Sequence, residues 1–308
     1  MDKLVSLREA VEAFLIDGCS FSYGGIAGRE PMAVILEIVR QGYKDLTLIT
    51  AVSTDPANIL LGAGCLKRIE MAYAWIGIVG SGLNLRRAVE KGVPNYVEVR
   101  EYSNYAASLR FLAGAMDVPF LPTRTMLGSD IPTYNEVIKI TDCPYTGEKL
   151  ALVPAARPDV AFIHVQKADR MGNCQIWGVE SNDTNIARAA EKLVITCEEI
   201  ISTEEIRSLP NMTAIPYYCV DAVVHLPLGC HPLPVAGYYA MDLPFRREFM
   251  KYNRTHEGFR QWLDEWVFSL KDHQEYLGKL GQDRLEKLKK LETDFNPIPV
   301  LVKEVSHK

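Results

Sequence analysis

Short apolar runs alternate with stretches of helical periodicity along most of the chain. The runs are short enough for strands and continuous enough for burial on both faces, as in a parallel sheet. Between them, apolar residues recur at the three- and four-residue spacing of helices that pack on such a sheet. The alternation therefore predicts an α/β fold with an open, doubly wound, mostly parallel sheet.

The expected elements follow from this pattern. Strands are expected at residues 19–23, 46–50, 68–74, 95–99, 118–121, 159–165, 192–197 and 221–226. Helices are expected at residues 6–17, 31–41, 55–63, 84–91, 104–115, 184–190 and 203–208. Thr54 and Ser103 precede helices as N-caps. Four glycines stand where helices should end: Gly18, Gly42, Gly64 and Gly92.

Two regions depart from the alternation. Residues 122–158 hold five prolines and few periodic stretches, so we expect a long irregular insertion that lines a pocket or a subunit contact. Residues 244–308 lose the sheet pattern, and we expect a helical extension packed on an α/β domain of residues 1–243. The apolar stripe at 259–270 is dense in aromatic residues and also suits a partner subunit.

The composition excludes several functional classes. The net charge is -5 and the basic residues are scattered, so there is no electrostatic footprint for nucleic acid or an anionic membrane. No apolar run approaches the roughly 20 residues of a bilayer span, and the N-terminus lacks the pattern of a signal peptide. The seven cysteines form no Cys-x-x-Cys pair, which fits reduced thiols. We therefore expect a cytoplasmic protein that acts on small molecules.

One cluster has residue types that bind metals. His225, Cys230 and His231 lie close together in the chain. The prolines and glycine among them preclude a helix that would align ligands, so we expect a structural loop in place of a zinc site. We expect no metal and no permanently bound cofactor.

A glycine-rich turn follows the first long strand. Gly24, Gly25 and Gly28 let the chain turn without Cβ clashes, and Pro31 suits the first position of the next helix. Backbone N–H groups and the helix dipole then converge on one spot, which favours an anion. A plain strand-to-helix connection accounts for the same residues. The turn matches neither the dinucleotide-binding nor the P-loop pattern.

Other polar residues follow expected strands, where active sites of open α/β sheets lie. Glu101 is placed to act as a nucleophile or general base, or only to cap the next helix. Ser81 with Gly82, and Gly128 with Ser129, form small turns that can present donors to a carbonyl or carboxylate, or can be turns alone. One of four cations near strand ends would suit a carboxylate substrate, although most surface Arg and Lys side chains are simply solvated. They are Arg29, Arg124, Lys167 and Arg170.

These residues occur together in a known family. Gly24-Gly25 with Arg29-Glu30-Pro31, the Glu101-Tyr102-Ser103 turn and Gly128-Ser129 resemble the alpha subunits of family I CoA-transferases. Residues 265–273 are most similar to the A subunit of the glutaconate CoA-transferases within that family. The resemblance covers nearly the whole chain.

The resemblance implies the alpha subunit of a heteromeric enzyme that moves coenzyme A between an acyl-CoA and a (di)carboxylic acid such as glutaconate. In this family the attacking glutamate usually belongs to a homologous beta subunit, in a Ser-Glu-Asn-Gly-like motif that this chain lacks. The chain would then line the pocket and be active only with the beta subunit. Glu101 would have a supporting role, and the expected substrate-binding residues are Gly24, Gly25, Arg29, Ser81, Tyr102, Ser103, Gly128 and Ser129.

Two alternatives stay open. Relatives of the same architecture hydrolyse ring-opened CoA thioesters with a carboxylate of the alpha chain, or decarboxylate glutaconyl-type CoA thioesters. Glu101 is the position at which this chain would carry such chemistry. A non-catalytic ligand-binding subunit is the alternative from another class, and only the missing nucleophile favours it.

Overall fold

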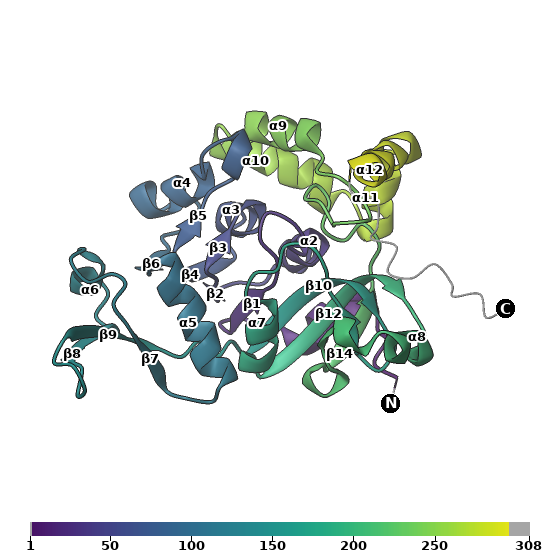
Figure 1. Cartoon of the computed structure of the whole chain (residues 1–308). Helices are drawn as coiled ribbons and strands as arrows, with labels where there is room; N and C mark the ends of the chain where they lie inside the picture. The colour runs from purple at the N-terminus through teal and green to yellow at the C-terminus, as the bar shows by residue number, and fades with distance from the viewer. Residues whose placement is uncertain (1, 296–308) are drawn as a thin grey trace.

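The computed structural model describes residues 2–295, and within them a central sheet lies between layers of helices (Figure 1). Seven neighbouring strands run parallel in the order β14-β12-β10-β1-β2-β4-β6. The expected doubly wound, mostly parallel sheet is confirmed. The strand bounds are β1 Ser20–Tyr23, β2 Leu46–Ile49, β4 Leu66–Met71, β6 Glu98–Glu101, β10 Val160–Ala168, β12 Lys192–Ile200 and β14 Ala222–His225.

Two short strands extend this sheet beside the end of β10. β10 is longer than β1, and where β1 has ended, Lys167 and Ala168 pair antiparallel with β11 (Cys174–Gln175). β13 (Thr213–Ile215) pairs with β11 in turn. Because β11 takes the position beside β10, the chain that leaves β1 turns away from the sheet at Gly24.

Alternate residues of the central strands face different helical layers. In β10, Val160 and Phe162 belong to one apolar core, and Ala161 and Ile163 belong to another. The first core includes residues of α1 (Leu7–Phe14), α2 (Met32–Gln41), α3 (Asp55–Gly62) and α4 (Leu83–Lys91). The second includes residues of α5 (Asn104–Ala115) and α7 (Asp183–Ala189). A further short helix is α8 (Thr203–Ser208).

Local chemistry sets most helix ends as expected. The Ser103 hydroxyl accepts the N–H of Ala106 and caps α5. The glycines expected to end helices all have positive φ: Gly18, Gly42, Gly64 and Gly92. Gly42 and Gly92 are themselves the left-handed C-caps of α2 and α4.

Thr54 is the N-cap residue of α3 as expected, but its side chain does not cap the helix. The Thr54 side chain makes no capping bond, because its hydroxyl donates to the buried carboxyl of Glu30. The hydroxyl of Ser53 accepts the N–H of Ala57 in its place. The neighbouring residue therefore satisfies the helix, and Thr54 is left to hold a buried acid.

An antiparallel arm projects from the β6 side of the sheet (Figure 1). It pairs β7 (Phe120–Thr123) and β8 (Lys139–Asp142) with β9 (Lys149–Pro154), and it carries the short helix α6 (Ile131–Tyr134). The irregular insertion expected at 122–158 is therefore partly wrong, since these elements order it. The strand expected at 118–121 exists, but it belongs to the arm.

Helices follow β14 as expected. Phe245 and Phe249 pack edge-on against Trp266 and Trp262, each pair with ring centroids 4.8 Å apart, and the aromatic stripe is part of the first core. No described helix is both long and apolar enough to cross a membrane. Residues 296–308 of the expected extension lie outside the described residues. The helix bounds are α9 Leu243–Tyr252, α10 His256–Leu263, a π-helix Asp264–Phe268, α11 His273–Leu280 and α12 Gln282–Phe295.

The remaining described elements are small and join the main ones. They are β3 Val52–Ser53, which pairs with β5 Tyr73–Ala74, and the 3₁₀ turns Gly77–Val79, Pro210–Met212 and Tyr217–Cys219.

Candidate active site

The chain changes direction across the sheet at β1. From β1 it proceeds through β2, β4 and β6 on one side, and it then returns through β10, β12 and β14 on the other. In open α/β sheets, ligands bind outside the carboxyl ends of the strands at such a switch point. The turn after β1, residues 24–29, lies at this position, and we refer to it as the active-site loop.

The backbone of the active-site loop is unusual. Gly25, Ala27 and Arg29 have φ values of 88°, 52° and 57°, and the N–H of Ile26 donates to the carbonyl of Gly28. Non-glycine residues with positive φ are uncommon and cluster at functional sites. Among the described residues, the N–H groups of Ala27 and Gly28 have no hydrogen-bond acceptor. These two adjacent donors are available to a ligand.

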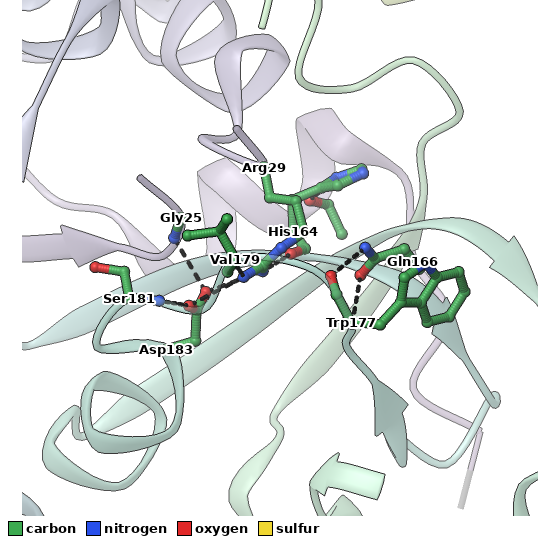
Figure 2. Close-up of polar contacts among 9 residues, drawn as sticks. Gly25, Arg29, His164, Gln166, Trp177, Val179, Ser181 and Asp183 are labelled. Carbon is green, nitrogen blue, oxygen red and sulfur yellow. Dashed lines mark hydrogen bonds and ion pairs between the residues drawn. The ribbon is translucent and has the colours of Figure 1, made fainter. Parts of the chain in front are cut away.

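Arg29 is turned inward rather than towards solvent (Figure 2). Its side chain is only 3% exposed and forms an ion pair with Asp183, at 3.1 Å between Nη1 and Oδ1. Its terminal nitrogens also donate to the carbonyls of His164 and Val179, at 3.1 and 3.0 Å. The expectation that Arg29 binds a substrate carboxylate stays a prediction, and these contacts favour the structural alternative.

A pocket of about 410 Å³ adjoins the active-site loop. Residues 26–29 form one wall, and Trp177 and Val179 form another. Pro234, Ala236 and Glu292 of α12 complete the lining. The C-terminal helix therefore contributes to a pocket whose other residues come from the α/β core, and Ala27 and Gly28, whose N–H groups have no acceptor among the described residues, are among the lining residues.

A network of buried polar side chains lies next to the active-site loop, and it includes His164, whose carbonyl accepts a hydrogen bond from Arg29. His164 in β10 contacts Glu198 in β12 at 2.9 Å between Nε2 and Oε1, and the hydroxyl of Tyr239 donates to the same carboxylate oxygen. The other Glu198 oxygen accepts the N–H of Leu228. Hydrogen-bonded networks of this kind fix the position of the strands that carry them.

Glu30 is a second buried acid beside the loop. Its oxygens accept hydrogen bonds from the N–H and the hydroxyl of Thr54, at 3.1 and 2.6 Å. Burial raises the pKa of Glu30 to about 8, although the Thr54 hydroxyl lowers it in part. The nearby Asp55 also raises this pKa. The carboxyl is therefore largely protonated at neutral pH.

Glu101 lies apart from the active-site loop. It ends β6, which is separated from β1 by β2 and β4, so the two strand ends are about 14 Å apart at the usual strand spacing. Its side chain is exposed and lines a separate pocket of about 210 Å³ with Tyr134 and Asn135 of the arm. The strand that carries Glu101 is therefore not adjacent to the strand that precedes the active-site loop.

Tyr102 and Ser103 follow Glu101, and both side chains make structural contacts. Tyr102 is buried, and the guanidinium carbon of Arg110 lies 4.2 Å from its ring centroid. Burial raises the pKa of the Tyr102 hydroxyl. Ser103 caps α5 and bonds to Thr125. A substrate-binding role for either residue stays a prediction.

The remaining expected residues lie in separate loops. Ser81 is half-buried in the turn that precedes α4. Gly128 and Ser129 are exposed between β7 and α6, and the Ser129 hydroxyl donates to the carbonyl of Met126. The structure thus unites Gly24, Gly25 and Arg29 in one site. It brings Gly128 and Ser129 to the arm near the Glu101 pocket, and it leaves Ser81 by α4.

His231 makes structural hydrogen bonds and is not part of a group of metal ligands. Its Nδ1 is 2.7 Å from the hydroxyl of Tyr276, and its Nε2 is 3.0 Å from Asp242. Arg284 of α12 also binds Asp242. Among residues 2–295, no three His, Cys, Asp or Glu side chains are grouped as metal ligands would be.

Comparison with known proteins assigns the family. The profile of the Coenzyme A transferase family matches residues 4–226. The chain belongs to this family. The matched region runs from before α1 to the end of β14 and includes the whole active-site loop.

Known relatives of this CoA-transferase chain match it over nearly its full length. It is 39% identical over 284 residues to the A subunit of the 3-oxoadipate CoA-transferase of Pseudomonas knackmussii, with 92% of this chain and 100% of that one covered. It is 38% identical over 307 residues to the A subunit of the glutaconate CoA-transferase of Acidaminococcus fermentans, with 94% and 95% covered.

Solved structures agree with this assignment. The structure of glutaconate CoA-transferase from Acidaminococcus fermentans superimposes with a TM-score of 0.90 at 37% identity, over 93% of this chain and 95% of that one. A structure of the decarboxylase AibA/AibB gives a TM-score of 0.73 at 33% identity, over 86% and 100%. The chain is the alpha subunit of a family I CoA-transferase, as its sequence motifs indicate.

Asp183 is the site residue that sequence reasoning missed. It contacts Gly25 and Arg29, from which it is separated by more than 150 residues. The available signal was an acidic residue directly before the helix expected at 184–190. Such a residue is commonly a helix cap, so the signal did not distinguish the two roles.

Proposed function

We propose that this CoA-transferase subunit moves coenzyme A between an acyl-CoA and a dicarboxylic acid of the glutaconate or 3-oxoadipate type. The observation that carries the proposal is the near full-length similarity to the A subunits of two enzymes named for such acids. Both acids have two carboxylates separated by a short carbon chain. We also propose that the enzyme acts in the cytoplasm.

The proposed partner is a homologous beta subunit that supplies the nucleophilic glutamate. The relatives are named as one lettered subunit of a larger enzyme, and this chain has no Ser-Glu-Asn-Gly-like motif. The partner carboxylate attacks the thioester carbonyl and releases CoA thiolate, which leaves a mixed anhydride. The thiolate then attacks the glutamyl carbonyl and releases the first acid, which leaves an enzyme–CoA thioester. The carboxylate of the second acid then attacks the enzyme–CoA thioester, which releases CoA thiolate and forms a second mixed anhydride. The thiolate attacks the acyl carbonyl of that anhydride, which frees the glutamate and gives the new acyl-CoA.

The active-site loop is the proposed contribution of this chain to that chemistry. Each attack places negative charge on a carbonyl oxygen, and fixed N–H donors stabilise such an oxyanion. The adjacent N–H groups of Ala27 and Gly28 have no acceptor among the described residues, and both residues line the 410 Å³ pocket. Their positions support a role in holding a thioester or carboxylate oxygen.

The first test is reconstitution. The purified chain should transfer no CoA between acids, because the nucleophile is not in it, whereas the chain mixed with the beta subunit should do so. The assay follows acyl-CoA exchange between glutaconate, 3-oxoadipate and a monocarboxylate such as acetate as control. Robust transfer by the isolated chain contradicts the half-enzyme proposal.

A second candidate is hydrolysis or decarboxylation of a CoA thioester, with Glu101 handling a proton or a water. One observation favours it: the exposed Glu101 carboxylate lines its own pocket at the sheet edge. Glu101→Gln should then abolish turnover, because it removes the base. For the transferase, the same change should only slow the reaction and leave the CoA adduct in place. The control is Glu136→Gln, which alters another carboxylate in the lining of that pocket.

A further inference from the structure

We propose that Asp183 is a positioning residue for CoA transfer, which holds the active-site loop in its ligand-binding conformation from the far side of the switch point. The inference rests on the proposed function in one respect, that substrate is bound at this loop. Asp183 does not itself line the pocket. It acts through Gly25, the second residue of the loop, and Arg29, the last.

The Asp183 carboxylate gathers donors from two segments (Figure 2). Oδ1 accepts the N–H of Gly25 at 3.0 Å and Nη1 of Arg29 at 3.1 Å. Oδ2 accepts the N–H of Ser181 at 3.0 Å and Nη2 of Arg29 at 3.2 Å. The carboxylate is 1% exposed, so it is fully committed to these four bonds. Charge-assisted bonds of this kind are stronger than neutral ones.

The Arg29 guanidinium is equally committed. Besides Asp183, its two terminal nitrogens donate to the carbonyls of His164 in β10 and Val179. The four terminal N–H groups therefore have four acceptors, and of the five guanidinium donors only Nε–H has no acceptor among the described residues. The pair is electrically neutral. A substrate carboxylate would have to compete with a buried ion pair for Arg29. Holding the loop requires no such competition.

Gly24 and Gly25 are needed in the loop for different reasons, and at Gly24 the reason is the Asp183 side chain. A Cβ on Gly24 would lie 2.4 Å from the Asp183 Oδ1 and 3.0 Å from Cγ2 of Ile163. Gly24 therefore leaves room for the carboxylate. Gly25 has a φ of 88°, and a Cβ there would lie 2.6 Å from the carbonyl oxygen of Gly28. Gly25 therefore permits the turn itself.

The loop conformation needs an external hold. Ala27 and Arg29 both have positive φ, and such backbone conformations persist only where the surrounding structure imposes them. Asp183 binds the loop before Ala27 through the Gly25 N–H, and after it through the Arg29 side chain. The unpaired N–H groups of Ala27 and Gly28 lie between these two attachments. The backbone bonds from Gly24 to Phe162 and from Arg29 to Pro234 also hold the two ends of the loop, and Asp183 adds the contacts that join those ends to each other.

The experiment uses the reconstituted complex with Asp183→Asn or Arg29→Lys, variants that keep side-chain size or charge. Amide hydrogen exchange of residues 24–29 reports the loop directly, and kcat and KM for the acid acceptor report the reaction. The matched control is Asp159→Asn. Asp159 also accepts a backbone N–H of β1, that of Ser20 at 2.6 Å, but at the opposite end of the strand.

Both variants should speed exchange in the loop and lower kcat by about 10- to 100-fold, since misplacement of about 1 Å costs that much. KM for the acid should change by less than about threefold. Asp159→Asn should leave kcat unchanged. If Arg29 instead binds the acid directly, Asp183→Asn frees its charge, so KM falls while kcat is kept, and that result overturns the proposal.

The outcomes separate this inference from the proposed function. Unchanged exchange in the loop overturns the positioning role whatever the activity. Faster exchange with unchanged kcat also overturns it, and places the reaction away from the loop. A wild-type complex that transfers no CoA to dicarboxylates contradicts the proposed function alone. The role of Asp183 is still tested in that case, because amide hydrogen exchange of the loop does not depend on activity.

Discussion

Glu30 directly follows the active-site loop, and its protonation links the stability of the site to pH. Burial raises its pKa to about 8, so the folded chain retains a proton there that the unfolded chain releases near the ordinary value of 4.5. Between these two values the unfolded state binds fewer protons than the folded state. The stabilisation from Glu30 is therefore complete below about pH 4.5 and is lost as the pH rises to about 8.

Glu30→Gln should remove this dependence, because glutamine is neutral at every pH and can still bond to Thr54. Relative to wild type, the variant should gain on the order of 3 kcal/mol in free energy of unfolding between pH 5 and pH 8.5. Urea denaturation at both pH values measures it. Glu12→Gln, an exposed carboxylate on α1, is the control. An identical pH dependence in Glu30→Gln and wild type would show that Glu30 is ionised in the folded chain.

The residues of the turn can be predicted from the sequence, whereas the distant residue that contacts them, Asp183, cannot. Glycines, Arg29 and Pro31 are neighbours in the chain, so their convergence at a strand end follows from local rules. Asp183 reaches them only because β10 lies beside β1 in the sheet. Strand order is a long-range property, and the alternation of apolar runs does not specify it. The ion pair between Arg29 and Asp183 is therefore not evident from the sequence around Arg29.

At the scale of elements, burial decided what could be predicted. β2, β10 and β12 are buried on both faces over most of their length and consist largely of apolar residues, so their expected positions lie close to the observed bounds. β8 of the arm has all four residues exposed and carries no such signal. Residues 118–121 do carry one, but an apolar run does not indicate whether its neighbour will be parallel or antiparallel.

The arm also determines the surroundings of Glu101. Asn135 donates to the carbonyl of Glu101, and Tyr134 of α6 lines the same pocket. The Glu101 pocket therefore depends on an element that the sequence pattern did not reveal. This is why the composition of that site, unlike the turn after β1, could not be anticipated from neighbouring residues.

At the scale of the whole molecule, the chain has a family fold and a pocket at the switch point, but no motif for the covalent nucleophile. The C-terminal helices complete that pocket through Glu292 of α12, and Arg284 of the same helix binds Asp242. The C-terminal helical region therefore contributes a residue to the pocket itself. Under the proposed function, the beta subunit supplies the attacking carboxylate.

The most direct measurement is mass spectrometry of both polypeptides after the complex is treated with acyl-CoA in the absence of an acceptor acid. The account predicts a CoA thioester on a glutamate of the beta subunit, none on this chain, and loss of activity when borohydride reduces the adduct. The absence of any adduct on the partner, together with an inactive Glu101→Gln variant, would contradict it and assign the chemistry to this chain.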